Sequence, residues 1–273
     1  MTKLIDAHVL ITGGSQGIGL AFARQCLAKG ARVSLVARDS ARLAQVAAEL
    51  MSDGQFSERV TTESADVTDA PALSAAVDRL VDKMGPVDVL VANAGAAVPG
   101  HFETLPLVAF DDQMKLNYLG IVYSIRAVLP SMIERGNGHL MLMSSDAGVV
   151  GVYGYSAYSP TKFAVRGLAE TLRSEMRPYS IKVSCVFPPD TDTPGLATES
   201  LTKPEATALI SGAIRVRTAD QVAHAMIKGI QRNRLLVTAD AGGALLLRIG
   251  GLLGPYVRWS MDRKVRKAAR SAR

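Results

Sequence analysis

The sequence predicts one α/β domain built on a doubly wound, mostly parallel, seven-stranded sheet with helices on both faces. Short apolar runs alternate along the chain with segments that have the apolar spacing of helices, which is the pattern of repeated βαβ units. These runs are apolar throughout, as expected for strands that are covered on both sides. The chain has 273 residues, of which 48% are hydrophobic, so it can bury a large core.

Seven segments are predicted as strands because each is short, mostly apolar and followed by a polar or turn-forming stretch. In chain order they are AHVLIT (7–12), ARVSLVA (31–37), RVTTESA (59–65), VDVLVANAG (87–95), HLMLMSS (139–145), IKVSCVF (181–187) and LLVT (235–238). The third is the weakest prediction, because polar residues interrupt it.

Helices are predicted between these strands wherever apolar residues recur every three or four positions. The ranges are 18–30, 40–53, 70–85, 105–135 and 159–178, and the fourth contains two helical patterns. Gly30 is suited to ending the first helix, Ser40 to capping the second, and Pro71 to opening the third. Pro178 is expected to end the last.

Composition argues against several classes of function. Four scattered histidines and two cysteines have no metal-ligand spacing, so no metal site is predicted. Unpaired cysteines suit a reducing compartment, and the N-terminus has no signal-peptide pattern, which predicts a cytoplasmic protein. Of 31 basic and 25 acidic residues, seven basic and one acidic lie within 258–273, so residues 1–257 are neutral overall. Nucleic-acid binding is therefore not expected.

The segment TGGSQGIG (12–19) follows the first strand and opens the first helix. Its glycines let the backbone approach a ligand closely, and the N-terminus of the following helix favours a phosphate. This turn predicts a dinucleotide site of the Rossmann type, although its G-x-x-x-G-x-G spacing differs from the common fingerprint. The predicted contacts are Gly13, Ser15, Gln16, Gly17, Ile18 and Gly19. A hydrolase with Ser15 as nucleophile also matches G-x-S-x-G, but that motif is not expected on the first strand.

Charge after the second strand predicts which dinucleotide binds. An NAD site places a carboxylate there for the ribose hydroxyls, whereas this chain has Arg38 and, one helical turn later, Arg42. Guanidinium groups suit a 2′-phosphate, so NADPH is the predicted cofactor. Asp39 is compatible with this prediction only if it points away, and a solvated helix start is the alternative explanation of the two arginines.

One tyrosine, Tyr158, has a lysine four residues later, Lys162. On a helix these two side chains share a face, and Pro160 between them places Tyr158 at the helix entrance. Ser145 ends the fifth strand, where open α/β sheets bind their ligands, and Ser144 faces the other way. A phenol whose pKa is lowered by a nearby ammonium and a cationic nicotinamide can donate a proton to a ketone oxygen that Ser145 also binds. Lys162 is also expected to hold the ribose, so Tyr158 and Lys162 are both predicted to contact the cofactor.

Together these motifs resemble the short-chain dehydrogenase/reductase family over nearly the whole chain. The resemblance is carried by TGGSQGIG, Asp66-Val67, NAG at 93–95, Asn117, and Ser145 with Tyr158 and Lys162. It implies that Asp66 and Val67 contact the adenine, that Asn93 braces the cofactor turn and that Asn117 holds a water that relays protons. It also implies a homodimer or homotetramer. Helix caps and strand-end turns are the plain alternatives for Asp66, Asn93 and Asn117.

Within that family, residues 144–207 resemble the 3-ketodihydrosphingosine reductases, which reduce 3-ketosphinganine to sphinganine with NADPH. The matching segments are YSPTKFAVRGLAETLRSEMRPYS, PPDTDTPG and TKPEAT. Because this substrate carries an ammonium, we expect Asp190 or Asp192 to pair with it. The resemblance also places Thr193 at the nicotinamide amide. The alternative is that the two carboxylates only cap turns.

The chain divides into a predicted NADP(H)-binding and catalytic domain, 1–240, and a C-terminal extension, 241–273. The extension begins with the apolar segment GGALLLRIGGLLGPYVRW (242–259) and ends in the basic residues. This pattern is typical of a segment lying on an anionic membrane surface, here the cytoplasmic face. An oligomer contact or a lid is the alternative.

Two other functions stay open. The chain can be a reductase of another long-chain oxo compound, such as a 3-oxoacyl thioester or a steroid. It can also be a non-catalytic NADP(H)-binding module that docks on a membrane, although the intact Ser145, Tyr158 and Lys162 argue against that.

Overall fold

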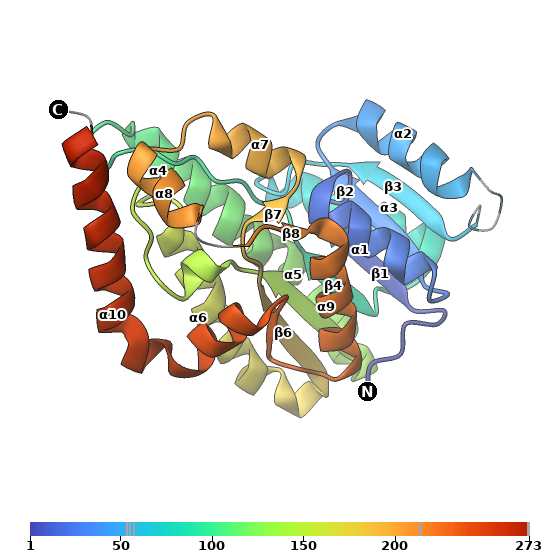
Figure 1. Cartoon of the computed structure of the whole chain (residues 1–273). Helices are drawn as coiled ribbons and strands as arrows, with labels where there is room; N and C mark the ends of the chain where they lie inside the picture. Colours follow the sequence, from blue (N-terminus) through green and yellow to red (C-terminus); the bar gives the residue numbers. More distant parts are fainter. Residues whose placement is uncertain (53, 55, 57, 213–214, 272–273) are drawn as a thin grey trace.

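The predicted fold class is confirmed. The computed structural model describes residues 1–52, 54, 56, 58–212 and 215–271, and the seven predicted strands form one sheet in the order β3-β2-β1-β4-β5-β6-β9 (Figure 1). All six neighbouring pairs are parallel. The strands are β1 (His8–Thr12), β2 (Arg32–Ala37), β3 (Val60–Ser64), β4 (Val89–Ala92), β5 (Gly138–Met143), β6 (Ile181–Phe187) and β9 (Leu236–Thr238).

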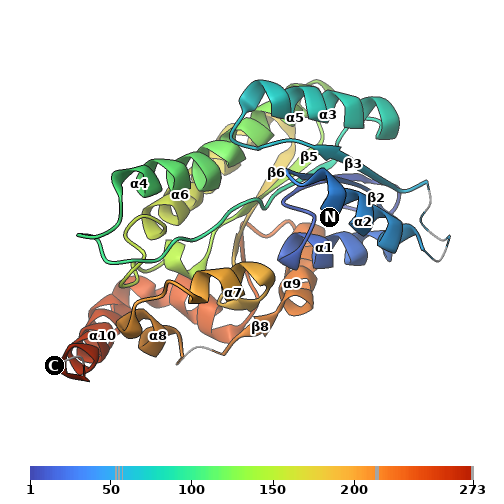
Figure 2. The same cartoon turned by 90° about the horizontal axis from the view of Figure 1, so that it is seen from above.

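Helices cover both faces of the sheet, which explains why its strands are apolar throughout. Figure 2 shows α3 and α5 on one side of the sheet and α1 and α9 on the other. Successive strand residues point into different cores, since Val9 and Ile11 belong to one buried cluster and Leu10 to the other. The first face carries α1 (Gly17–Leu27), α2 (Ser40–Met51) and α9 (Ala219–Gln231), and the second carries α3 (Ala70–Met84), α5 (Gly120–Arg135) and α6 (Ser159–Glu175).

The predicted helical stretch 105–135 is one run with a π-helical turn inside it. This run consists of α4 (Leu107–Met114), the π turn (Lys115–Leu119) and α5. Single π turns inside α-helices often occur at functional sites, and here the turn carries Asn117, which is fully buried.

Within the described residues, the run 107–135 is also the one helix long and apolar enough to cross a membrane, with a mean hydropathy of 1.3. The most apolar window of this run is 39% buried, and its inward residues Ile121, Ile125 and Val128 belong to the core beside the sheet.

Three predicted helix ends are wrong in detail. The helix predicted over 159–178 ends at Glu175, and Pro178 lies in a separate 3-10 turn, Arg177–Tyr179. Asp39, not Ser40, caps α2, because its side chain accepts a hydrogen bond from the Arg42 backbone N–H at 2.9 Å. The first helix ends at Leu27, and Gly30, with φ of 78°, forms the turn after it. Residue 53, the last of the predicted range 40–53, lies outside the described residues.

The sequence did not predict helix α9, nor the short elements that lie between β6 and α9. They are β7 (Thr191–Asp192), α7 (Pro194–Ser200), α8 (Glu205–Ser211) and β8 (Arg217–Thr218), and β7 pairs with β8. The C-terminal extension is a single long helix, α10 (Ala241–Ser271), that contacts α8 (Figure 1). Lys264 Nζ of α10 donates to the Ile210 carbonyl at 3.5 Å. Arg273, the last of the basic residues counted above, lies outside the described residues.

Candidate active site

The glycine-rich turn joins β1 to α1 at the carboxyl edge of the sheet. Gly13 and Gly17 have φ of 67° and 55°, a conformation that strongly favours glycine. Gly19 is required for a different reason, since a Cβ there would collide with the Gly13 carbonyl and lie 2.8 Å from Asn93 Nδ2. The three glycines therefore set the shape of the turn.

Two side chains from distant parts of the chain hold this turn. Asn93, just after β4, donates from Nδ2 to the carbonyls of Thr12 at 3.0 Å and Gly13 at 3.1 Å. Thr193 lies against the other side, because a Cβ on Gly17 would be 3.1 Å from Thr193 Cγ2. The Thr193 hydroxyl caps α7 by accepting from the Leu196 N–H. The start of α7 thus adjoins the turn.

The turn fits the diphosphate of a dinucleotide. A Cβ at Gly13, Gly17 or Gly19 would press on Asn93, Thr193 or the turn's own backbone, so only glycines allow this compact turn. The N-cap of α1, Gln16, makes no side-chain hydrogen bond to the helix, so the first backbone N–H groups of α1 are left to a phosphate. Ser15 and Ile18 flank Gln16 and Gly17 in the same turn.

The two arginines predicted to bind a 2′-phosphate lie beside this turn. Arg42 donates from Nε to the Ser15 carbonyl at 3.3 Å. Arg38 is exposed at the end of β2, with Nη1 4.0 Å from Asp66 Oδ2. The carboxylate of Asp39 caps α2 by accepting the Arg42 N–H at Oδ1, and whether it points away from the ribose stays a prediction.

Asp66 and Val67 follow β3 at the same edge. Asp66 Oδ1 accepts the Thr68 N–H at 2.8 Å. Burial acts to raise the pKa of Asp66, but the hydrogen bonds from Thr68 and the charge of Arg38 outweigh it and the pKa is lowered. Val67 is buried against Gly120, where a Cβ would lie 2.9 Å from Val67 Cγ2. Asp66 is therefore an ionised acceptor with a fixed backbone.

Tyr158 and Lys162 lie on one face at the start of α6, as their spacing predicts. Tyr158 is the N-cap residue and Pro160 occupies the first turn of the helix. Lys162 is 3% exposed, its Nζ lies 5.5 Å from the centroid of the Tyr158 ring, and it donates to the Met143 carbonyl at 3.0 Å. Burial lowers the pKa of the Lys162 ammonium to about 8.

Ser145 and Ser144 point to different partners. Ser144 is buried and donates to the Lys162 carbonyl at 2.8 Å. Ser145 is half-buried, accepts the Ala147 N–H at 3.2 Å and interacts with the side chain of Tyr158. Ser145 is therefore the hydroxyl beside the phenol.

The lowered pKa expected for Tyr158 is not found in the structure. From the sequence we expect Lys162 to lower the pKa of the Tyr158 phenol, but in the structure this pKa is raised. Burial is the main cause, and the carboxylates of Glu199 and Asp190 add to it, while Ser145 acts in the opposite direction. The phenol is therefore protonated at neutral pH and ready to donate.

Asn117 and Gly95 form a tight contact next to the lysine. The Asn117 side chain binds both backbone groups of Ala96, accepting the N–H and donating to the carbonyl at 2.9 Å each. A Cβ on Gly95 would lie 2.7 Å from Asn117 Oδ1 and 3.3 Å from Lys162 Nζ. The π turn thus brings Asn117 close to Lys162, and the proton relay implied for Asn117 stays a prediction.

The two aspartates expected to bind the substrate differ in their surroundings. Asp192 is exposed in β7. Asp190 Oδ2 lies 3.4 Å from Lys203 Nζ, and Lys203 also pairs with Glu199 at 2.9 Å. Glu199, Lys203 and Tyr155 were not predicted; Glu199 and Lys203 are four residues apart, a spacing that often indicates an ion pair, although Lys203 lies beyond the end of α7.

A further carboxyl group follows Ser145. Asp146 Oδ1 is buried without a hydrogen-bond partner among the described residues. Burial, with Asp240 and Asp190 nearby, raises the pKa of Asp146 to about 7. The sequence does not indicate this shift, because Asp240 is distant along the chain.

Comparisons with known proteins agree with this geometry. The family model described as short chain dehydrogenase matches residues 7–204. A 3-dehydrosphinganine reductase from Danio rerio is 46% identical over 249 residues, which cover 89% of this chain and 74% of that protein. A 3-ketodihydrosphingosine reductase from Bos taurus is 42% identical over 248 residues, covering 89% and 74%.

Solved structures share the fold as well. The short-chain dehydrogenase from Sphingobium yanoikuyae in complex with NADPH has a TM-score of 0.76 and 27% identity, and the match covers 97% of this chain and 95% of that one. Levodione reductase has a TM-score of 0.79 and 27% identity, covering 88% and 98%. From its sequence, its sheet and its site, this chain belongs to the short-chain dehydrogenase/reductase family of oxidoreductases.

Proposed function

We propose that this protein reduces 3-ketosphinganine to sphinganine with NADPH, as a step of sphingolipid synthesis. The observation that carries the proposal is the group formed by Ser145, Tyr158 and Lys162 beside the glycine-rich turn. The similarity of the chain to a 3-dehydrosphinganine reductase, over 89% of its length, supports this substrate.

NADPH, when bound, supplies the hydride that reduces the ketone carbon. Tyr158 donates its phenolic proton to the carbonyl oxygen, so that the carbonyl π bond is replaced by one C–H and one O–H bond. Ser145 donates a hydrogen bond to the same oxygen and orients it. The buried Lys162 ammonium stabilises the phenolate that Tyr158 becomes, and proton return through Asn117 and water completes the cycle.

Arg38 and Arg42 support NADPH over NADH. Both lie at the adenosine end of the turn, and Arg42 is held against Ser15. We propose that they bind the 2′-phosphate, that Asp66 and Val67 contact the adenine, and that Thr193 contacts the nicotinamide amide. Similar solved structures include complexes with NADPH and with NADP, and also one with NAD, so the preference for NADPH rests on the two arginines.

The test is steady-state oxidation of NADPH by purified protein with 3-ketosphinganine, with NADH and a 3-oxoacyl thioester as controls. We expect 3-ketosphinganine to have the higher kcat/KM and NADPH to be preferred. A higher kcat/KM with the thioester would replace the sphingolipid assignment by the other long-chain reductase.

We also propose that α10 lies on an anionic membrane surface, on its cytoplasmic face. Exposed apolar side chains recur on one side of this helix at positions 245, 249, 252, 256 and 259, with Leu252 84% and Trp259 56% exposed. Arg263 stacks on Trp259, and further basic residues follow, which suits acidic headgroups. Co-sedimentation with phosphatidylserine vesicles, but not with phosphatidylcholine vesicles, is expected.

The Trp259→Ser variant should weaken that sedimentation. If the wild-type protein binds neither kind of vesicle, and light scattering shows that Trp259→Ser has a different oligomeric state from wild type, α10 is an oligomer contact instead. For the protein in solution we expect a homodimer or homotetramer.

A further inference from the structure

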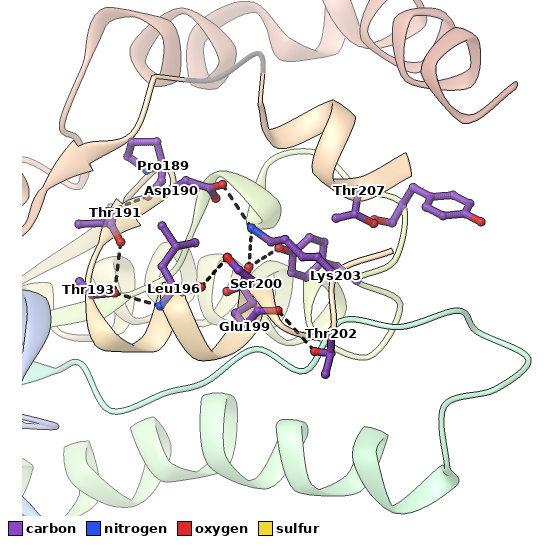
Figure 3. A network of polar contacts seen from close by, with 12 residues as sticks. Pro189, Asp190, Thr191, Thr193, Leu196, Glu199, Ser200, Thr202, Lys203 and Thr207 are labelled. Atoms are coloured by element: carbon purple, nitrogen blue, oxygen red, sulfur yellow. Dashed lines mark hydrogen bonds and ion pairs between the residues drawn. The ribbon is translucent and has the colours of Figure 1, made fainter. Parts of the chain in front are cut away.

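Three charged side chains form a cluster beside the proposed reaction site. Lys203 Nζ lies between Asp190 Oδ2 at 3.4 Å and Glu199 Oε1 at 2.9 Å (Figure 3). The Lys203 side chain is 7% exposed, that of Glu199 16% and that of Asp190 27%. We call these three residues the carboxylate–lysine cluster.

This cluster is joined to the catalytic tyrosine through Tyr155. The Tyr155 hydroxyl donates to Glu199 Oε1, and the Tyr155 ring lies 5.7 Å from the Tyr158 ring, centroid to centroid. Both carboxylates are near enough to raise the pKa of the Tyr158 phenol. The cluster therefore borders the place where the carbonyl oxygen must lie during proton transfer.

The cluster carries one more negative charge than positive charge. Two carboxylates face one ammonium, and in a half-buried place an excess charge needs a partner. Each carboxylate uses one oxygen in the ion pairs above, while a carboxylate can accept several hydrogen bonds. Lys203 is itself an alkylammonium group bound by these two carboxylates, so the pair can bind a group of this kind.

We propose that Glu199, together with Asp190, binds the ammonium group of the substrate next to the Lys203 ammonium. This inference rests on the proposed function, in which the amino group sits on the carbon next to the carbonyl. With the carbonyl oxygen at Ser145 and Tyr158, the cluster is placed to receive that nitrogen, because Tyr155 contacts both Glu199 and the Tyr158 ring. Glu199 and Asp190 thereby determine specificity for amino ketones.

Binding of the ammonium has a second consequence at Tyr158. The excess negative charge of the cluster opposes formation of the phenolate. A substrate ammonium neutralises that charge, so Tyr158 gives up its proton more readily when an amino ketone is bound. The cluster thus couples substrate recognition to proton donation.

The test compares two substrates on four proteins. The substrates are 3-ketosphinganine and the same ketone with hydrogen in place of the amino group. The proteins are wild type, Glu199→Gln, Asp190→Asn and, as a matched control, Glu205→Gln, which changes an exposed acid at the start of the neighbouring helix α8. We expect Glu199→Gln to lower kcat/KM for the amino ketone about ten- to a hundredfold, the worth of one charge-assisted hydrogen bond.

The same Glu199→Gln variant should not lower kcat/KM for the ketone without nitrogen, because loss of this carboxylate also eases formation of the phenolate at Tyr158. Asp190→Asn should show the same pattern with a smaller loss, and Glu205→Gln should change kcat/KM for neither substrate. Equal losses on both substrates would mean that the cluster only holds α7 in place, and would overturn the inference. If wild type reduces the nitrogen-free ketone but not 3-ketosphinganine, it is the proposed function that fails.

A measurement on wild-type protein covers the case in which Glu199→Gln does not fold. N-acetylation of 3-ketosphinganine removes the positive charge and keeps the ketone and the alkyl chain. We expect kcat/KM for the N-acetyl compound to fall at least tenfold, provided that a nitrogen-free ketone of the same length is reduced. Equal kcat/KM for the free amine and the acetylated compound would contradict an ammonium site at the cluster.

Discussion

The contact between Gly95 and Asn117 gives a sharp test of the site geometry. In Gly95→Ala the new Cβ would lie 2.7 Å from Asn117 Oδ1, whereas ordinary van der Waals contact begins at 3.4 Å. Asn117 must therefore retreat by about 0.7 Å, which strains its two hydrogen bonds to Ala96, and Lys162 Nζ, at 3.3 Å, must also yield. Because a shift of about 1 Å can cost about a hundredfold in rate, we expect kcat to fall about ten- to a hundredfold.

The assay is NADPH oxidation with saturating 3-ketosphinganine, with the thermal midpoint measured in parallel. Gly167→Ala is the matched control, because Gly167 lies inside α6 and a Cβ there meets no atom within 4 Å. Gly167→Ala should keep the wild-type kcat and gain about 0.5–1 kcal/mol of stability from helix propensity. A Gly95→Ala protein with wild-type kcat and an unchanged thermal midpoint would refute the close packing of Gly95, Asn117 and Lys162.

Three further predictions concern charges. Arg42→Leu should raise KM for NADPH about tenfold and leave KM for NADH unchanged, because only NADPH has a 2′-phosphate; equal changes for both cofactors would reject that role. Burial lowers the pKa of Lys162 to about 8, so the ammonium is lost above that pH and kcat/KM for the ketone should decline there. In Lys162→Arg the charge persists, so the decline should disappear. An identical decline in both proteins would contradict the assignment. The pKa of Asp146 is raised from 3.8 to about 7 by burial, so the folded state holds a proton that the unfolded state releases, and stability should fall as pH rises from about 4 to 7. Asp146→Asn should therefore gain stability relative to wild type over that range in urea unfolding, and a constant difference between pH 4.5 and 7.5 would contradict the raised pKa.

Much of the fold was predictable because its elements leave local patterns. Most strands of the sheet are largely apolar runs, since helices cover both of their faces, and the polar exception, β3, lies at the sheet edge. The dinucleotide turn, and the pair of Tyr158 and Lys162, are also local, because one turn or one helix face holds all of their residues. Such patterns need no knowledge of the rest of the chain.

The parts that failed depend on contacts between distant segments. The raised pKa of Tyr158 arises from burial and from Glu199 and Asp190, which belong to α7 and the loop before β7. The π turn around Asn117 has no sequence pattern that distinguishes it from ordinary helix. The cap of α2 was misplaced by one residue, because Asp39 and Ser40 are both good capping residues and only the backbone conformation selects between them.

The most direct test of the account follows the hydride and the tyrosine proton together. Wild-type protein is mixed with 3-ketosphinganine and NADPH that carries deuterium at the transferable position of its nicotinamide ring, and the sphinganine formed is analysed by mass spectrometry. The account predicts one deuterium on the carbon that bears the new hydroxyl, and a rate at least about a hundredfold lower in Tyr158→Phe with unchanged NADPH binding. Unlabelled product, or a Tyr158→Phe protein as fast as wild type, would contradict it.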